Sequence, residues 1–267
     1  MDVKLVQFTE DAPDLAAISS GKADGGGIAT NTWLTAMESK LPLSAVLVLD
    51  KSTTADAVLG NSKMTSVADL RGKSVAFEEG TTSDVLLHYA LEQQKIPFSA
   101  IKPVHMPAAQ AGTALIAGRV DAAVTYEPYI SAALGAPKKI HPIFTAGQRP
   151  GLISDVLVLR TDVVRQHPEK IRALLKAWDD AVNYLRSDPQ SGQAIITKAV
   201  GAPAGSLTSA FKGVEMFDRQ QSQSLVKSTF PSTYLEIARA AKAGGLLKSD
   251  PPPFDRAFDG TFLSTAD

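Results

Sequence analysis

The sequence predicts an α/β protein with two lobes, each built on a sheet with helices on its faces. The main observation is an internal repeat, because GKADGGGIATN at 21–31 is matched by GRVDAAVTYEP at 118–128. An apolar segment precedes each stretch, VKLVQF at 3–8 and IKPVHM at 101–106, and a segment with helical spacing lies between. A strand–turn–helix–strand unit that occurs twice indicates two equivalent crossover connections in two similar sheets. Such sheets cover their faces with helices.

The elements follow in order along the chain. Gly21 and Gly118 stand where a helix is expected to end in a left-handed residue, and the aspartate three positions later begins the next strand. Pro168 suits the first turn of the clearest helix. We expect strands at 3–8, 43–50, 56–60, 73–80, 101–106 and 153–160, one or two helical turns at 65–72, helices at 81–95, 126–135 and 167–189, more helix to about residue 247, and an extended tail from 251.

Composition excludes several classes of function. The chain has 267 residues, which fit one large domain or two modest ones, and its net charge of −1 offers no broad basic field for nucleic acid. It has no cysteine, which excludes disulfides, thiolate metal sites and cysteine nucleophiles. No apolar run approaches the roughly 20 residues of a membrane span.

No catalytic, cofactor or metal site is predicted. The four histidines, at 88, 105, 141 and 167, have no metal-ligand spacing, and a GxSxG motif is absent. The glycines at 25–27 are not followed by a phosphate-loop pattern, so close backbone packing is the better interpretation.

The start of the helix at 81–95 is a candidate anion site. A glycine and three hydroxyls stand directly before or within its first turn, where free N–H groups and the helix dipole favour negative charge. The alternative is ordinary capping, with Thr81 or Thr82 as N-cap and Asp84 closing the box. The candidate residues are Glu79, Gly80, Thr81, Thr82 and Ser83.

Two further candidates follow the repeated strands. Thr30, Asn31 and Thr32 offer donors at a helix start, beside the apolar Trp33; the alternative is a cap and a core tryptophan. In the other lobe, Tyr126 and Glu127 could grip a ligand amine or hydroxyl. The alternative there is a plain helix start with Pro128 in the first turn.

Three aspartates are also candidates. Asp50 ends a buried strand and Asp56 begins the next, where either could only brace the turn. Asp155 lies within an apolar run, where a carboxylate is costly unless it is paired. It is therefore a structural partner or a ligand contact near the crossing between the lobes.

Several phrases together resemble the substrate-binding proteins of ABC importers, in the nitrate, sulfonate and taurine group related to thiamine-precursor binding proteins. They are LAAISSGKADGGGIAT, AVLVLDKSTTADAVLG, SVADLRGKSVAFEEGTTSDVLL, ALIAGRVDAAVTYEPYISAAL and GLISDVLVLRTDVVRQHPEKIRALLKAW. The resemblance implies a type 2 periplasmic-binding-protein fold with a mixed sheet in each lobe. Lobe I would comprise 1–62 and 150–267, and lobe II 63–149. It further implies an additional strand and helix before residue 1.

The same resemblance implies a function. A small solute would bind between the lobes, extracytoplasmically, and a membrane permease would be the partner of a monomeric protein. The family's ligand loops fall on Thr30–Thr32, Ser52, Thr53 and Thr54, Glu79–Ser83, and Tyr126–Glu127. These loops contain many carboxylates and few cations, so a zwitterion such as an aminosulfonate is favoured over a simple anion. A neutral or cationic heterocycle, or the effector of a transcription regulator, is the alternative.

Overall fold

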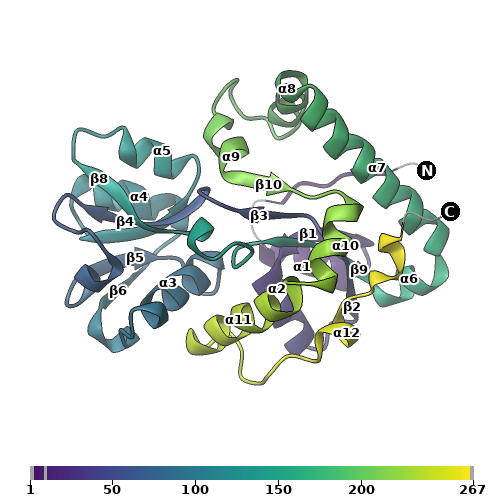
Figure 1. The fold of residues 1–267 in the computed structure, drawn as a ribbon, viewed down its shortest axis with the longest axis horizontal. Helices are drawn as coiled ribbons and strands as arrows, with labels where there is room; N and C mark the ends of the chain where they lie inside the picture. The colour runs from purple at the N-terminus through teal and green to yellow at the C-terminus, as the bar shows by residue number, and fades with distance from the viewer. Residues whose placement is uncertain (1–2, 9–10, 265–267) are drawn as a thin grey trace.

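The computed structural model describes residues 3–8 and 11–264, and most of its strands fall into two sheets (Figure 1). The first sheet has the order β1-β9-β2, and the second has the order β6-β5-β7-β4-β8. A ribbon of β3 and β10 lies between them. The strands are β1 Gly25–Ala29, β2 Leu43–Val48, β3 Asp50–Ser52, β4 Asp56–Asn61, β5 Ser74–Phe77, β6 Lys102–His105, β7 Ala122–Tyr126, β8 Ile140–Thr145, β9 Asp155–Arg160 and β10 Val214–Met216.

The helices flank both sheets. They are α1 Asp11–Ser19, α2 Thr30–Glu38, α3 Thr82–Gln93, α4 Ala108–Ala117, α5 Tyr129–Leu134, α6 Thr161–Gln166, α7 Pro168–Ser187, α8 Pro189–Ala199, α9 Thr208–Gly213, α10 Arg219–Lys227, α11 Phe230–Ala243 and α12 Phe254–Ala257. Gly21 and Gly118 both end their helical segments with positive φ, 74° and 72°, as predicted. Within the described residues, no helix is both long and apolar enough to cross a membrane.

The central strands β4, β5 and β7 of the second sheet are buried on both faces. Side chains alternate along each strand, so neighbouring residues reach opposite faces. Ala57 and Leu59 of β4 pack with α4 and α5 on one face, whereas Val58 belongs to the core on the α3 side. This arrangement explains why these central strands are almost continuously apolar.

The repeat is present in the sheet order. β1 pairs antiparallel with β9, which pairs antiparallel with β2. In the same way β7 pairs antiparallel with β4, which pairs antiparallel with β8. The second sheet adds β5 and β6 in parallel beside β7, and is therefore mixed. The described strands of the first sheet are all antiparallel, which differs from the mixed sheet expected there.

The predicted strand at 3–8 is wrong, because these residues form no strand. The repeat gives the reason: its counterpart β6 does not pair with β7 directly, since β5 lies between them. A strand at 3–8 would likewise be one strand's width away from β1. A hollow of ≈ 1190 Å³ lies there, and its lining includes residues 3–8 and Gly25–Gly27.

Other differences concern short elements. The lobe boundary predicted after residue 62 differs from the sheet pairing, because β4 belongs to the five-stranded sheet. The strands β3, β8 and β10 were not anticipated, and the tail expected to be extended contains α12. β3 and β10 are three residues each, which is too short for a period to be recognised.

At the junction between the two sheets, several hydrogen bonds converge on one carbonyl group. The carbonyl oxygen of Gly213 accepts hydrogen bonds from the backbone N–H of Thr53, at 2.7 Å, and from the Thr53 hydroxyl, at 2.9 Å. The N–H groups of Thr54 and Ala55 point to the same oxygen. On the other side, the N–H of Gly147 donates to the Thr53 carbonyl at 2.6 Å. Three chain segments therefore meet with no space for side chains.

Alanine at either glycine is expected to destabilise the fold. A Cβ at Gly147 would lie 2.7 Å from the Thr53 carbonyl oxygen, and one at Gly213 would lie 2.6 Å from the Ala55 nitrogen. Because both obstacles are backbone, Gly147→Ala and Gly213→Ala should each lower the free energy of unfolding by about 1–3 kcal/mol in urea titrations. Gly260→Ala is the control, since no atom lies within 4 Å of its added Cβ. Equal effects at all three positions would contradict the crowded junction.

Candidate functional site

The first repeat strand, β1, is followed directly by α2, whose start lies at the junction. This helix start lacks a side-chain cap. The N–H and the hydroxyl of Thr30 both donate to the Ser154 carbonyl at 2.9 Å, which fixes the helix start beside β9. The preceding residue is Ala29, so no side chain caps the helix. A helix start of this kind leaves N–H groups and the positive end of the dipole to be satisfied by other groups.

Asn31 is the polar group that stands out at this helix start. Its side chain is 3% exposed, and its amide nitrogen has no hydrogen-bond partner in the described part of the chain. Burying an unpaired amide is unfavourable by an amount comparable to a lost hydrogen bond. Thr32, the third predicted residue, is also buried. The α2 start therefore combines backbone donors with an unused side-chain donor, which suits an oxyanion.

Three carboxylates lie next to the α2 start. Asp155 is the strand partner of Ala29. Asp50 and Asp56 lie before and after Thr53–Ala55, the segment that crosses from β3 to the second sheet and is called the crossing segment below. Burial and then the Asp155 charge hold the pKa of Asp50 well above its usual range; the Asp155 N–H acts in the opposite direction, and Asp56 adds a smaller increase. Burial raises the pKa of Asp56 to about 6.

Ser52 lies within this acidic group. Its hydroxyl is buried and stands beside the Asp56 carboxylate without a hydrogen bond of normal geometry. The contact with Ser52 acts to lower the pKa of Asp56, but the opposing effect of burial is larger, so the pKa remains raised. The other two residues of the predicted loop differ from Ser52: Thr53 holds the junction through Gly213, and Thr54 contributes its backbone N–H there.

The second lobe contributes aromatic and acidic side chains. Tyr126 is the strand partner of Asp56, is 39% exposed, and has its ring edge-to-face with Tyr129 at 5.3 Å. Burial first, then Tyr129, Glu78 and Asp56, raise the pKa of the Tyr126 hydroxyl. The carboxylate of Glu127 accepts hydrogen bonds from the N–H and hydroxyl of Ser131. Glu127 therefore caps α5, as in the simpler of its two interpretations.

The start of α3 is closed by its own side chains. Thr81 is the N-cap and accepts from the Ser83 N–H at 3.3 Å, while Asp84 accepts from the Gly80 N–H at 3.0 Å. Glu79 lies at the surface, 3.4 Å from a nitrogen of His105. Thr82, the first helical residue, is partly exposed. The capping interpretation of this segment therefore holds for Thr81 and Asp84.

These contacts divide the predicted residues into groups. Thr30, Asn31, Ser52 and Asp155 meet at the junction, together with Asp56 and, through it, Tyr126. The α3 start faces the far end of α11 instead, because Gly80 would contact Leu246 through an added Cβ. Sequence reasoning missed Ser154 and Tyr129. Ser154 precedes a predicted strand with no pattern of its own, whereas the second tyrosine of YEPY was a visible signal.

A family model described as NMT1/THI5 like matches residues 1–192. The chain belongs to this family. Its fold matches that of a solved binding protein: a crystal structure of the periplasmic aliphatic sulphonate binding protein SsuA from Escherichia coli superposes with a TM-score of 0.82. That alignment covers 96% of this chain and 82% of the other, at 23% identity.

Two sequence relatives of this NMT1/THI5-like chain come from Escherichia coli strain K12. One is named an aliphatic sulfonates-binding protein and is 28% identical over 206 residues, which cover 76% of this chain and 63% of the relative. The other is named the taurine-binding periplasmic protein and is 22% identical over 245 residues, which cover 90% of this chain and 77% of the relative.

The raised pKa of Asp56 predicts a pH-dependent stability. A carboxyl whose folded pKa exceeds its unfolded value contributes stability at low pH that is lost as pH rises through the folded pKa, here from about 4 to about 6. Asp56→Asn should therefore raise the melting temperature by about 3 °C near pH 7.5 and leave it unchanged near pH 4. Thermal melts across this range test it, with the exposed Asp255→Asn as control. A stabilisation that is the same at both pH values would contradict the assignment.

Proposed function

We propose that this chain is the extracytoplasmic solute-binding component of an ABC importer, and that it binds a small aminosulfonate at the junction between its two sheets. The observation that carries the proposal is the uncapped α2 start, where the buried amide nitrogen of Asn31 has no described partner and the preceding Ala29 is the strand partner of Asp155. The names of the relatives support the solute class, since they refer to aliphatic sulfonates and to taurine.

The acidic end of the solute belongs at the α2 start. A sulfonate has three acceptor oxygens, which match the Asn31 amide and the N–H groups of the first helical turn. The other two helix starts that the sequence predicted are less suitable. Thr81 and Asp84 occupy donors of α3, and Glu127 occupies those of α5.

The amine of the solute belongs among the carboxylates. Among the described residues, the groups that shift the pKa of Asp50 and Asp56 include no lysine or arginine. A bare anion at Asn31 would therefore meet a negative field at close range. An ammonium group a few bonds from the sulfonate would supply the missing positive charge, and would favour the ionised forms of Asp50, Asp56 and Asp155.

The second lobe would complete the site. Tyr126 offers a half-exposed ring and hydroxyl next to Asp56, on a strand that moves with the other sheet. A rotation about the crossing segments would bring Tyr126 over a solute held at α2, so that contacts to both sheets drive closure. The loop at Glu79–Ser83 would then form an outer rim of the site.

This function is binding and not catalysis. The relatives are named as binding proteins. Of the histidines, His88 is 3.3 Å from Asp84 and stacked on Phe98, in a buried position on α3. A membrane permease is the partner that a solute-binding component requires. The exposed ring of Tyr126 beside Asp56 also favours a second candidate, a cationic heterocycle stacked on the tyrosine.

Calorimetry with taurine, methanesulfonate, nitrate and an aminopyrimidine tests the proposal. Taurine should bind more tightly than methanesulfonate and nitrate, which lack the amine. Asn31→Ala should weaken taurine binding by about 10- to 100-fold, the value of a hydrogen bond to a charged group. Asn183→Ala, at an exposed position of α7, is the control and should leave binding unchanged. Tight binding of the aminopyrimidine alone would favour the heterocycle.

The pH dependence of this binding gives an independent test. Taurine affinity should fall as pH drops from about 7.5 to about 5, because Asp56, with its pKa of about 6, becomes neutral and no longer attracts the ammonium. Asp56→Asn should remove most of this dependence. The opposite trend, with tighter binding in acid, would mean that protonated carboxyls donate to a simple anion and would overturn the zwitterion.

A further inference from the structure

We propose that the end of the second sheet that lies farthest from the junction binds an anionic phospholipid surface. This end is called the basic end below and comprises residues 62–74, 95–102, 118–121 and 136–141. It carries eight lysine and arginine side chains, all of them exposed, and two aspartates. The inference concerns a different surface from the solute site and goes beyond the function proposed above.

The strand directions gather these bases at one edge of the sheet. β5 runs parallel to β6 and β7, whereas β4 runs antiparallel to β7 and β8. The first residues of β5, β6, β7 and β8 therefore lie at the same edge as the last residue of β4. Each of the five strands has a base within three residues of this edge. These bases are Lys63, Lys73, Lys102, Arg119 and Lys139.

Contacts between the segments show that the bases are neighbours. The N–H of Lys102 donates to the Lys73 carbonyl at 2.8 Å, which places these two lysines on adjacent pieces of chain. The ammonium of Lys138 lies at the end of α4, 2.6 Å from the point where a Cβ added to Gly118 would stand. Arg119 follows this glycine in the chain. The bases therefore gather on one surface across the sheet edge.

The two aspartates of the basic end are already engaged by neutral groups. Asp69 accepts hydrogen bonds from the N–H groups of Thr65, at 2.7 Å, and Ser66, at 2.9 Å. Asp121 accepts from the N–H of Ser74 at 3.0 Å and from its hydroxyl at 2.9 Å. In the described part of the chain, no ion pair joins any of the eight bases to a carboxylate.

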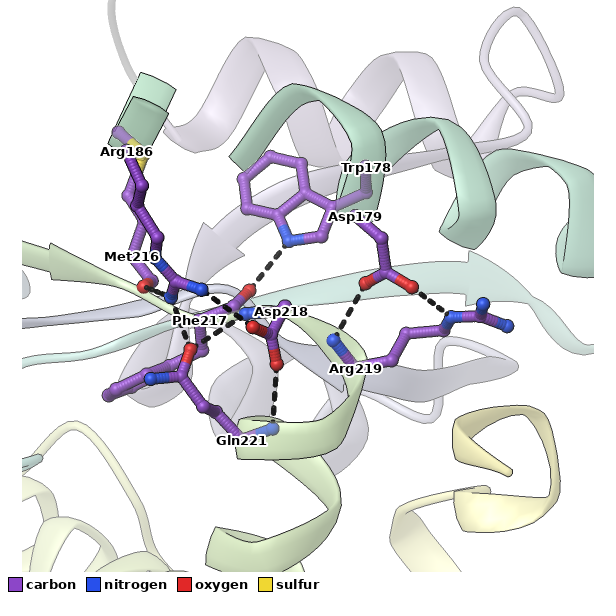
Figure 2. A network of polar contacts seen from close by, with 8 residues as sticks. All are labelled: Trp178, Asp179, Arg186, Met216, Phe217, Asp218, Arg219 and Gln221. Carbon is purple, nitrogen blue, oxygen red and sulfur yellow. Dashed lines mark hydrogen bonds and ion pairs between the residues drawn. The ribbon is translucent and has the colours of Figure 1, made fainter. Parts of the chain in front are cut away.

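Figure 2 shows two arginines near α10 that are each paired with an aspartate, in contrast to the basic end. Arg186 donates to the Asp218 carboxylate at 2.6 Å, and the Arg219 guanidinium donates to the Asp179 carboxylate at 2.5 Å. A base that is paired in this way attracts a further anion only weakly, because the two opposite charges cancel beyond short range. The bases of the basic end, with no such partner among the described residues, keep their charge for a binding partner.

The net charge of the whole chain conceals this surface. Residues 56–145, from β4 to β8, contain eight bases and eight carboxylates, and five of these carboxylates lie at the opposite ends of the strands. Along β5, Lys73 and Glu78 are five residues apart, which corresponds to about 17 Å in an extended chain. This distance is about twice the Debye length at physiological ionic strength, so the two ends act as separate charged surfaces. The five carboxylates are Asp56, Glu78, Glu79, Asp84 and Glu127.

A phospholipid surface suits the basic end better than a folded partner does. Neighbouring strands about 4.8 Å apart spread the five strand ends over about 19 Å, which makes a broad face. Six of the eight bases are lysines, whose compact charge on a flexible stem needs no fixed geometry in its partner, whereas arginine forks suit shaped acidic partners. Lipid phosphates form an array without fixed positions, and groups of about four to eight bases are typical of segments that bind anionic lipid.

Binding through the basic end would leave the junction free. The strands that begin at the basic end have their last residues at the junction side of the sheet, so a surface that covers one end does not cover the other. The partner proposed above, a permease, lies in a membrane, and a lipid-binding face would hold the chain near it. The inference itself requires no solute.

Co-sedimentation of the native chain with vesicles tests the inference. Phosphatidylglycerol-containing vesicles should bind the chain at about 50 mM salt and release it at about 300 mM salt, because salt screens the bases from the lipid phosphates. Vesicles of phosphatidylcholine alone should not bind it. Equal binding to both kinds of vesicle, or none to the anionic kind, would overturn the proposal. Binding to polyglutamate without binding to anionic vesicles would indicate an acidic polypeptide as the partner instead.

A triple variant of the basic end provides the second arm. Replacing Lys73, Lys102 and Lys138 by glutamine should weaken binding to anionic vesicles by about 100-fold, which is about fivefold for each charge removed. The matched control replaces three exposed lysines of α7, α8 and α10 by glutamine, changes the net charge equally, and should bind within about twofold of the native chain. These control positions are Lys170, Lys198 and Lys227.

Equal weakening in the two triple variants would refute the basic end as the binding surface. Melting temperatures establish that both variants fold, and if one does not, the vesicle and salt comparisons on the native chain still decide. Taurine affinity should be the same in both variants, because neither set of lysines belongs to the solute site. A failure of vesicle binding would therefore leave the proposed function intact, and an absence of taurine binding would leave the lipid surface intact.

Discussion

The carbonyl group of Gly213 is the point on which the arrangement of the two sheets depends. It accepts hydrogen bonds from three consecutive residues of the crossing segment, Thr53 to Ala55, and the Thr53 carbonyl in turn accepts from Gly147. Hydrogen bonds therefore join three pieces of chain directly: the segment that leaves the first sheet, the segment that returns to it, and the residue that precedes β10. Asp50, Ser52 and Asp56 belong to the same short stretch of chain as Thr53–Ala55. The hydrogen bonds that join the two sheets therefore also fix the positions of the acidic side chains.

The acidic group at the junction lowers the stability of the folded protein. Burial raises the pKa of Asp50 and Asp56, which means that their ionised forms are less favourable in the folded protein than in the unfolded chain. The unpartnered Asn31 amide adds to this cost. A buried amide donor and buried carboxylates, each destabilising by itself, lie at a place where both sheets contribute residues. Such clusters of perturbed groups are typical of binding sites, where the ligand satisfies them.

Much of the fold was predictable because it rests on local patterns. The repeat, the left-handed glycines at 21 and 118, and the Pro168 helix start all follow from residue type and spacing. The pairing of strands did not follow, because register and order depend on contacts distant in sequence. β4 shows this: its apolar pattern predicted a strand, but nothing in DAVLG indicates which sheet it joins. Residues 3–8 have the apolar pattern of a strand, yet they pair with none of the strands that the structure describes.

The same limit applied to the site. The sequence places hydroxyls and amides at three helix starts, and the repeat makes two of them equivalent, after β1 and after β7. Their environments then separate them. After β7, Glu127 satisfies the α5 start through Ser131, and Thr125 donates to the Ala108 carbonyl within its own lobe. After β1, an alanine precedes α2, and the first amide side chain is buried with no described partner.

We infer that duplication supplied two similar helix starts, of which one kept its donors for a solute and the other closed on itself. The different roles proposed for the two halves follow from where each half attaches to the junction. The α2 start is tied to Ser154, one residue before Asp155, so the proposed rotation of the sheets would leave the donors and Asp155 together in the first half. Tyr126 is tied to β4 and moves with the second sheet. On the function proposed above, one half would hold both ends of a zwitterion at fixed spacing, and the other half would cover it.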